Sequence, residues 1–197
     1  MAKPNVVSKQ DLIEAAKSCI AEHGMEKLTL KTVAEKANVT QGTVYYHFHT
    51  KNQLMLDVVK DVCQGSWNEL SQTTAHDIDI SVALQAAKER CGPDSFYHRL
   101  FLSLVVSGFT HQEIRQELGQ LIAFENSMLS EKIRELVGDG PDSRVMGISP
   151  ETWAVIMNAI IDGLAVQSLV SSDFDRERTF AELAFFFQQV LKKKQPE

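Results

Sequence analysis

The chain has 197 residues, of which 44% are hydrophobic and 23% are charged, and it carries a formal net charge of −6. This composition is typical of an ordinary globular protein with a substantial core, and its acidic balance argues at first sight against a nucleic-acid partner. The charge is uneven, however, because residues 1–51 hold seven lysines against five acids while the remainder holds 13 basic and 21 acidic side chains, and a basic N-terminal part keeps such a partner open.

Helical periodicity runs through nearly the whole sequence and predicts an all-α fold. About nine helices are expected, spanning roughly residues 8–23, 30–37, 41–48, 51–71, 81–91, 95–108, 112–137, 150–171 and 175–194. Capping residues mark several of the starts, namely Ser8, Thr40, Thr50 and the Ser149-Pro150 pair, and Gly24 is placed to end the first helix. The alternation of apolar and polar residues that indicates strands is absent from the sequence.

Residues 28–51 are predicted to form two short helices, each with one apolar face, joined by a tight turn. Val33 and Ala34 on the first helix can pack against the second helix, and the small alanine lets the two helices cross closely. Their expected partners are Val44 and Phe48. Two helices in this relation form a helix-turn-helix, whose second helix enters the major groove of DNA. The pattern therefore predicts a DNA-binding segment near the start of the chain.

The outward face of the second short helix is polar but carries few charges, unlike an ordinary solvated helix. Glutamine and threonine side chains can read base edges, and tyrosine, threonine and lysine can hydrogen-bond to phosphates. The expected DNA contacts are Lys31, Thr40, Gln41, Gly42, Thr43, Tyr45, Tyr46, His47 and Lys51. In an alternative interpretation, Tyr45 is a core aromatic and His47 is a satisfied surface histidine.

This stretch closely resembles the tetracycline-repressor (TetR) family of bacterial regulators. The resemblance covers residues 8–55 and is carried by Gly24, Leu28-Thr29, Val33-Ala34, Ala37, Val39, residues 42–48 (GTVYYHF) and residues 51–54 (KNQL). It implies that Gln41 and Thr43 lie at the floor of the groove. The implied contacts with the DNA backbone or nearby bases are Tyr45, Tyr46, His47 and Lys51. The rest of the chain matches the family only in general layout.

The resemblance also implies two domains. Residues 1–52 would form the helix-turn-helix DNA-binding domain, a three-helix bundle, and residues 53–197 a helical domain that binds a small-molecule effector and dimerises. Candidate effector contacts are apolar residues on inward stripes and polar residues among them, namely Trp67, His98, Phe101, Val105, Phe109, Phe124, Met128, Met157, Asn158 and Asp162. Such a lining suits a hydrophobic ligand or one of mixed polarity, although ordinary core packing also explains each residue.

The last two expected helices are apolar on more than one side. A helix with two apolar faces needs two partners, so we expect these helices to pair with their copies in a four-helix interface of a homodimer. The expected interface residues are Trp153, Ile156, Ile160, Leu164, Phe180, Leu183, Phe187 and Val190, and Phe185 and Phe186 add a second apolar face. The alternative is that both faces are buried within one chain.

The predicted function is that of a ligand-responsive, DNA-binding transcription regulator. The resemblance implies a repressor that a small effector releases from its operator. An all-helical enzyme is one alternative, but the sequence contains no glycine-rich phosphate loop, His-Glu-x-x-His motif or catalytic-triad signature. A helical small-molecule-binding protein that does not bind DNA is the other alternative.

No cofactor or metal is expected. Cys19, Cys63 and Cys91 are widely spaced, and Cys19 with His23 would supply two ligands where a structural zinc site uses four. No secretory leader is expected in residues 1–11, and no unbroken apolar run is long enough to predict a membrane span. The expected location is the cytoplasm, in association with the nucleoid.

Overall fold

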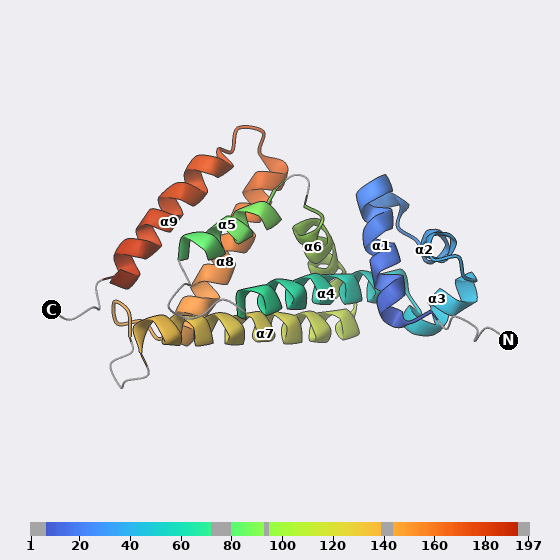
Figure 1. The fold of residues 1–197 in the computed structure, drawn as a ribbon, viewed down its shortest axis with the longest axis horizontal. Helices are drawn as coiled ribbons and strands as arrows, with labels where there is room; N and C mark the ends of the chain where they lie inside the picture. The colour runs from blue at the N-terminus through green and yellow to red at the C-terminus, as the bar shows by residue number, and fades with distance from the viewer. Residues whose placement is uncertain (1–6, 72–79, 93–94, 139–143, 193–197) are drawn as a thin grey trace. The chain divides into compact units, whose positions relative to one another are not determined.

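The computed structural model describes residues 7–71, 80–92, 95–138 and 144–192 of the chain. In chain order these residues form α1 (Lys9–His23), the short 3-10 helix η1 (Met25–Lys27), α2 (Leu30–Lys36), α3 (Gln41–Phe48), α4 (Lys51–Ser71), α5 (Ile80–Arg90), α6 (Tyr97–Gly108), α7 (Gln112–Val137), α8 (Pro150–Val170) and α9 (Arg176–Lys192), drawn in Figure 1. Over these ranges the all-α prediction is confirmed, and the only extended pairing there is an isolated bridge between Val145 and Ile148.

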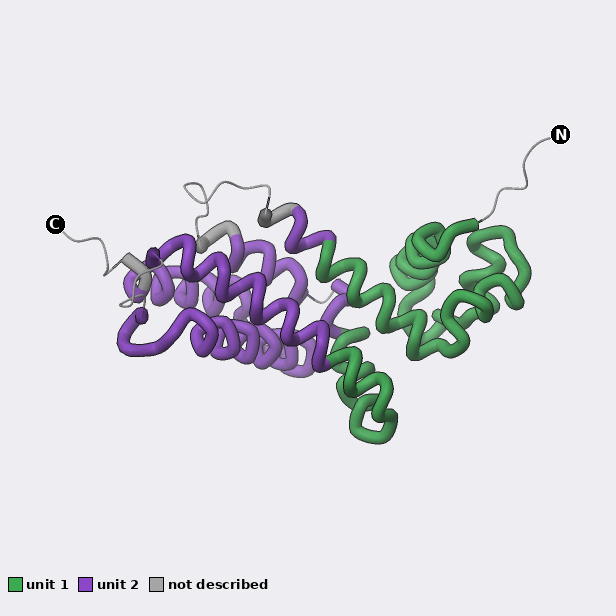
Figure 2. Tube along the Cα trace, turned by 90° about the horizontal axis from the view of Figure 1, so that it is seen from below, with its two compact units in different colours: residues 1–64, 99–118 green, residues 65–98, 119–197 purple. Residues whose placement is uncertain are grey.

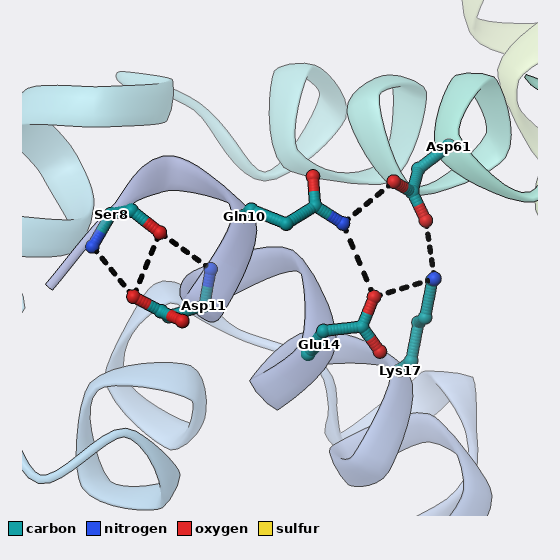
Figure 3. Close-up of polar contacts among 6 residues, drawn as sticks. All are labelled: Ser8, Gln10, Asp11, Glu14, Lys17 and Asp61. Atoms are coloured by element: carbon teal, nitrogen blue, oxygen red, sulfur yellow. Dashed lines mark hydrogen bonds and ion pairs between the residues drawn. The ribbon is translucent and has the colours of Figure 1, made fainter.

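Hydrogen bonds at capping residues explain where the first helices begin. Ser8 and Asp11 form a reciprocal capping box at the start of α1, in which each side chain accepts a hydrogen bond from the other residue's backbone N–H (Figure 3). Thr29 and Thr32 form the same arrangement at the start of α2. These contacts join residues three positions apart, so their residue types alone could predict the helix starts.

The chain divides into two compact units, coloured separately in Figure 2. Unit 1 contains residues 1–64 and 99–118, and unit 2 contains residues 65–98 and 119–197. The chain therefore enters unit 1 twice. The predicted functional boundary between residues 52 and 53 lies inside unit 1. Because compactness does not reveal what a segment does, that functional division stays a prediction.

Unit 1 is built on the apolar faces of its first helices. Leu12 of α1, Val33 of α2, Phe48 of α3 and Leu54 of α4 are completely buried. Each large side chain of this kind contributes about 2 kcal/mol of hydrophobic stabilisation relative to full exposure. The helix α2 packs against both α1 and α3. Its contact with α1 therefore supports the α2–α3 pair.

The first half of α4 makes polar contacts with the later segment of unit 1. Asn52 donates a hydrogen bond from Nδ2 to the Oγ of Ser107 in α6 at 2.8 Å. The second contact reaches the next helix: the Nζ of Lys60 in α4 lies 2.5 Å from the Oε2 of Glu117 in α7. These two contacts tie residues 99–118 to the helix that directly follows α3.

A second polar cluster joins α4 to α1 (Figure 3). Asp61 accepts a 2.7 Å hydrogen bond from the Nε2 of Gln10 and forms an ion pair with Lys17 through its other carboxylate oxygen. Glu14 contacts the same Gln10 and Lys17 side chains at 3.2 and 2.8 Å. Burial raises the pKa of the Asp61 carboxyl, but hydrogen bonds from Lys17 and Gln10 outweigh it and hold that pKa below its usual range.

Replacing Asp61 by asparagine is expected to lower the free energy of unfolding by about 1 kcal/mol at pH 7, because the ion pair with Lys17 is lost. A carboxyl group with a depressed pKa stabilises the fold above its unfolded-state pKa, and this stabilisation is lost as the pH falls. Urea denaturation from pH 7 down to pH 3 should therefore show the wild-type and variant values converging in acid. Glu26→Gln, at an exposed acid of η1, is the matched control. A constant gap would contradict this interpretation.

Unit 2 centres on Trp153 of α8 and Phe187 of α9, whose rings meet edge to face with centroids 6.1 Å apart. Leu84 of α5 and Ile133 of α7 are buried in the same cluster. The Nε1 of Trp153 donates a 2.9 Å hydrogen bond to the backbone carbonyl of Val145, so the buried indole has its polar partner. Four helices of unit 2 thus share one core.

Within the described ranges, α8 is the one helix long and apolar enough to cross a membrane by length and composition alone. Two polar residues interrupt its apolar stretch between residues 153 and 166, and both have partners inside unit 2. The Nδ2 of Asn158 donates a 2.7 Å hydrogen bond to the Oδ1 of Asn126 in α7, and Asp162 lies 3.6 Å from the Nε2 of His98 in α6. Because these pairings need neighbouring helices, we interpret α8 as a helix of the unit 2 bundle.

Candidate nucleic-acid interface and effector site

The helix-turn-helix geometry predicted for residues 28–51 is present in unit 1. The chain turns between α2 and α3 at Asn38, whose φ of 54° is a left-handed conformation that asparagine tolerates. Thr40 then caps α3, with its Oγ1 accepting a 3.2 Å hydrogen bond from the backbone N–H of Thr43. Residue types at the turn thus set the start and direction of the second helix.

The helix α3 has an apolar inner face and a polar, aromatic outer face. Val44 and Phe48 are completely buried, which fixes the rotation of the helix about its axis. Tyr45 and Tyr46 are consequently 56% and 76% exposed, and Gln41 is exposed beside them. The alternative that Tyr45 is a core aromatic is therefore wrong.

The remaining predicted DNA contacts differ in accessibility. Exposed are Lys31, Thr40, Gly42 and Lys51, and half-buried are Thr43 and His47. The Nζ of Lys31 lies 3.8 Å from a carboxylate oxygen of Glu35, a loose pairing that leaves the ammonium group accessible. Lys51 is the first residue of α4, where its charge and the backbone N–H groups of the first turn can meet the same anion. The surface around α3 thus offers polar and cationic groups suited to a DNA backbone.

Residues 12–58 match the sequence profile of a family described as "Bacterial regulatory proteins, tetR family". These residues contain most of α1, all of α2 and α3, and the first part of α4. Residues 12–58 are thus similar to the tetR family. The matched region therefore includes α3, with its exposed face, and the neighbouring helices that pack against its buried side.

Curated relatives extend the similarity beyond the tetR profile. The probable acrEF/envCD operon repressor of Escherichia coli K12 is 31% identical over 152 residues, which are 77% of this chain and 61% of the repressor. The HTH-type transcriptional regulator SrpR of Pseudomonas putida is 25% identical over 174 residues, which are 84% of this chain and 77% of SrpR. The chain thus spans about three-fifths of the length of the first of these relatives.

Solved structures share the fold at low sequence identity. A putative TetR-family transcriptional regulator from Rhodococcus sp. superposes with a TM-score of 0.69 at 23% identity, covering 92% of this chain and 96% of that one. The multidrug binding protein EbrR complexed with ethidium gives 0.61 at 21% identity, covering 93% and 99%. At these identities the likeness shows a common all-α fold.

The predicted effector contacts fall in both units. In unit 1, Phe101 is buried and Val105 half-buried on α6, as expected of an inward stripe. Phe109, just after α6, is 74% exposed. The expectation that Phe109 lies on an inward stripe is therefore wrong, because the helix ends at Gly108 and no longer sets the direction of the next side chain.

In unit 2, seven predicted effector contacts range from buried to partly exposed. They are His98 and Met157, which are buried, Trp67, Met128, Asn158 and Asp162, which are half-buried, and Phe124, which is 37% exposed. Asn158 was expected either to contact a ligand or to form a hydrogen bond with a neighbouring helix. It forms such a hydrogen bond, to Asn126 of α7. Their joint assignment to an effector site stays a prediction.

Sequence reasoning missed two further polar residues of unit 2. The hydroxyl of Tyr97 in α6 donates a 3.0 Å hydrogen bond to the Oε1 of Glu125 in α7, next to Asn126. The available signal was the adjacent polar pair Glu125-Asn126 in a helix that otherwise places apolar residues at helical spacing. Together with Asn158 and Asp162, these groups line facing helices of unit 2.

His98 is the most deeply buried titratable side chain of this polar group, with 3% of its surface exposed. Its Nδ1 lies 3.0 Å from the backbone carbonyl oxygen of Arg90, and its Nε2 lies 3.6 Å from the Oδ1 of Asp162. Both neighbours are acceptors, so a ring with an N–H on each nitrogen fits them. Burial lowers the pKa of His98, but Asp162, Cys91 and the Arg90 carbonyl outweigh it and raise the pKa to about 9.

This raised pKa predicts that stability falls in alkaline solution. A histidine whose folded-state pKa lies above its unfolded value stabilises the fold fully below about pH 6.5, and the contribution is lost as the pH rises through about 9. We expect the wild-type free energy of unfolding to drop by on the order of 2 to 3 kcal/mol between pH 6 and pH 10. Asp162→Asn should flatten this curve in urea titrations, whereas Asp173→Asn, at an exposed acid, should not. Parallel curves for wild type and Asp162→Asn would contradict the assignment.

The residues predicted for the dimer interface lie largely inside the single chain. Trp153, Phe180, Phe187 and Val190 are 7%, 3%, 1% and 9% exposed. The other four, Ile156, Ile160, Leu164 and Leu183, are half-buried and pack against the same clusters. The assignment of the four buried residues to an interface is therefore wrong, because periodicity identifies an apolar stripe without identifying the partner that covers it.

A different apolar face of α8 and α9 is exposed. On α8 it contains Val155, Val166 and Val170, which are 52%, 39% and 77% exposed, and the small exposed residues Ala159 and Gly163. On α9 it contains the two phenylalanines that add a second apolar face, Phe185 at 64% and Phe186 at 49% exposure. We refer to these seven residues as the outer face of α8–α9.

Proposed function

We propose that this protein is a homodimeric transcription regulator that binds an operator through α3 and releases it when a small effector binds. The observation that carries the proposal is the outer surface of α3, where Gln41, Tyr45 and Tyr46 are exposed over the buried support of Val44 and Phe48. This helix lies within residues 12–58, which match the tetR family profile. The relatives are named as transcription regulators and repressors rather than as enzymes.

The side chains of α3 suggest a division of labour on DNA. Gln41 and Thr43 at the start of the helix suit base edges, and the lack of a side chain at Gly42 allows the backbone to approach closely. Tyr45 and Tyr46 suit phosphate oxygens, and Lys51 adds a positive charge at the start of α4. We assign Lys31, Thr40 and His47 to backbone contacts around this core.

We propose a dimer because one copy has few unpaired positive charges with which to bind DNA phosphates. Lys17, Lys36 and Lys60 of unit 1 are each paired with a carboxylate, so they contribute little attraction for phosphates. Two copies joined through the outer face of α8–α9 would present two α3 helices to major grooves about 34–36 Å apart. Linking two weak sites raises their joint affinity without any new contact.

The effector we propose is a small molecule with an apolar body and a few polar groups. The apolar candidates Phe124, Met128 and Met157 of unit 2 suit its body, and polar residues of the same unit such as Asn158 suit its hydrogen-bonding groups. EbrR, which shares the fold, is a multidrug binding protein whose structures hold ethidium and proflavin. Effector binding would favour release only if the effector binds the DNA-free conformation more tightly. The proposed location is the cytoplasm, where an operator is accessible.

A binding assay with the DNA upstream of the protein's own gene tests the proposal. The purified full-length chain should retard this duplex at low salt, with two chains per bound site, and should do so at a lower concentration than a random duplex of equal length. Affinity should fall steeply with added salt, as expected when lysines displace counterions from phosphates. Equal affinity for both duplexes at every salt concentration would overturn operator recognition, and the absence of any binding would overturn the proposed function.

A further inference from the structure

The junction between α3 and α4 contains a strained residue that sequence reasoning did not assign to DNA binding. Only His49 and Thr50 separate the two helices. His49 has φ 57° and ψ −43°, and the backbone N–H of Thr50 donates a 2.5 Å hydrogen bond to the carbonyl of Phe48. A three-residue turn closed in this way, with a positive central φ, is the rare and strained form of the γ-turn.

Both helices depend on this turn. The N–H of His49 ends α3 by donating to the carbonyl of Tyr45 at 2.8 Å, and the Oγ1 of Thr50 opens α4 by accepting from the N–H of Gln53 at 3.0 Å. Glycine is the residue that adopts a positive φ without a steric penalty. An imidazole occupies the position instead. Strained residues of this kind persist where the surrounding structure holds them, and they concentrate at functional sites.

The side chain of His49 lies among the proposed DNA contacts. It is exposed, and its ring meets the Tyr45 ring edge to face with centroids 5.5 Å apart and an interplanar angle of 85°. Tyr45 precedes it by one helical turn, and the exposed Lys51 follows it by two residues. The Tyr45 contact holds the imidazole beside a phenol that suits phosphates, and the ammonium group of Lys51, two residues further along the chain, suits them too.

We infer that His49 is a DNA-backbone contact, in which an imidazole N–H donates to a phosphodiester oxygen next to the one bound by Lys51. An imidazole has at least one N–H donor in either protonation state, so the contact does not require a charged ring. The strained turn holds this donor where a glycine would leave none. The inference rests on the proposed function, because it assigns a residue to the same DNA surface.

Three variants distinguish the effect of the imidazole on DNA affinity from the effect of the backbone strain on stability. His49→Gly is expected to raise Tm by about 3 °C, since the strain is relieved, and to weaken binding to a random 30-base-pair duplex at low salt by about tenfold, since a donor to a charged group is lost. His49→Ala, which keeps the strain, should lose the same affinity without the rise in Tm. His49→Gln, whose amide can donate to a phosphate, should bind within about threefold of wild type.

Met146→Gly is the matched control. Met146 is an exposed non-glycine residue with φ 53° in unit 2, so its replacement should raise Tm as His49→Gly does without changing DNA affinity. Wild-type affinity in His49→Ala would overturn the inference, and so would a glutamine variant that binds as weakly as the alanine variant. A wild-type protein that binds no duplex would instead overturn the proposed function, so the two failures are distinguishable.

Discussion

Replacing Tyr46 and Lys51 together by alanine is expected to weaken operator binding by about 100- to 1000-fold and to leave the free energy of unfolding nearly unchanged. Tyr46 is 76% exposed and Lys51 is exposed at the start of α4, so neither side chain supports the core. Each lost contact to a phosphate removes a hydrogen bond to a charged group, and a dimer loses each of them twice. The expected loss of affinity therefore exceeds that of any single replacement on this surface.

Fluorescence anisotropy with labelled duplex at several salt concentrations measures this effect. Removing one lysine from each copy should reduce the slope of log affinity against log salt by about 2, whereas Tyr46→Ala alone should leave the slope unchanged. Lys132→Ala, on α7 of unit 2, is the matched control for loss of a lysine. Wild-type affinity in the double variant would exclude this face of α3 from the interface.

A negative charge on the outer face of α8–α9 is expected to separate the proposed dimer into monomers. Phe185 is 64% exposed in the single chain, so Phe185→Glu should leave the unit 2 core intact. In a symmetric interface the new carboxylates of two copies would be desolvated or would repel each other. We expect the dimer dissociation constant to rise at least about 100-fold, and operator affinity to fall with it.

Sedimentation at micromolar concentration, with circular dichroism to check the fold, distinguishes the outer face from the inner one. Phe187→Ala is the contrasting variant, because Phe187 is 1% exposed and packs against Trp153. It should lower the free energy of unfolding by about 3 to 5 kcal/mol. If Phe185→Glu sediments as a dimer while retaining its fold, the two copies associate through another surface.

The helix-turn-helix could be predicted because its determinants are local. The caps at Thr29 and Thr40 act over three residues, and the buried pair Val44 and Phe48 shows its spacing within one short helix. The exposure of Tyr45 and Tyr46 then follows from that spacing alone.

The rest of the site depends on information that residue types do not carry. Phe185 and Phe187 are both apolar, and the sequence does not show which of them packs into the chain's own core. That choice depends on α5 and α7, which are far away in sequence. The partner of Asn158 lies 32 residues earlier in α7. The strain at His49 is a property of the backbone, and its one sequence signal is a position between two helices where glycine would be expected.

The return of residues 99–118 to unit 1 has a consequence for the nascent protein. The side of α4 that holds Asn52 and Lys60 meets its partners Ser107 and Glu117 only after more than fifty further residues have been synthesised. At about 5–20 residues per second, a ribosome takes several seconds to make that stretch. During this interval the helix that follows α3 has one uncovered side. The growing chain therefore contains α3 before it contains the segment that completes unit 1, and α4 lacks these two contacts until that segment has been made.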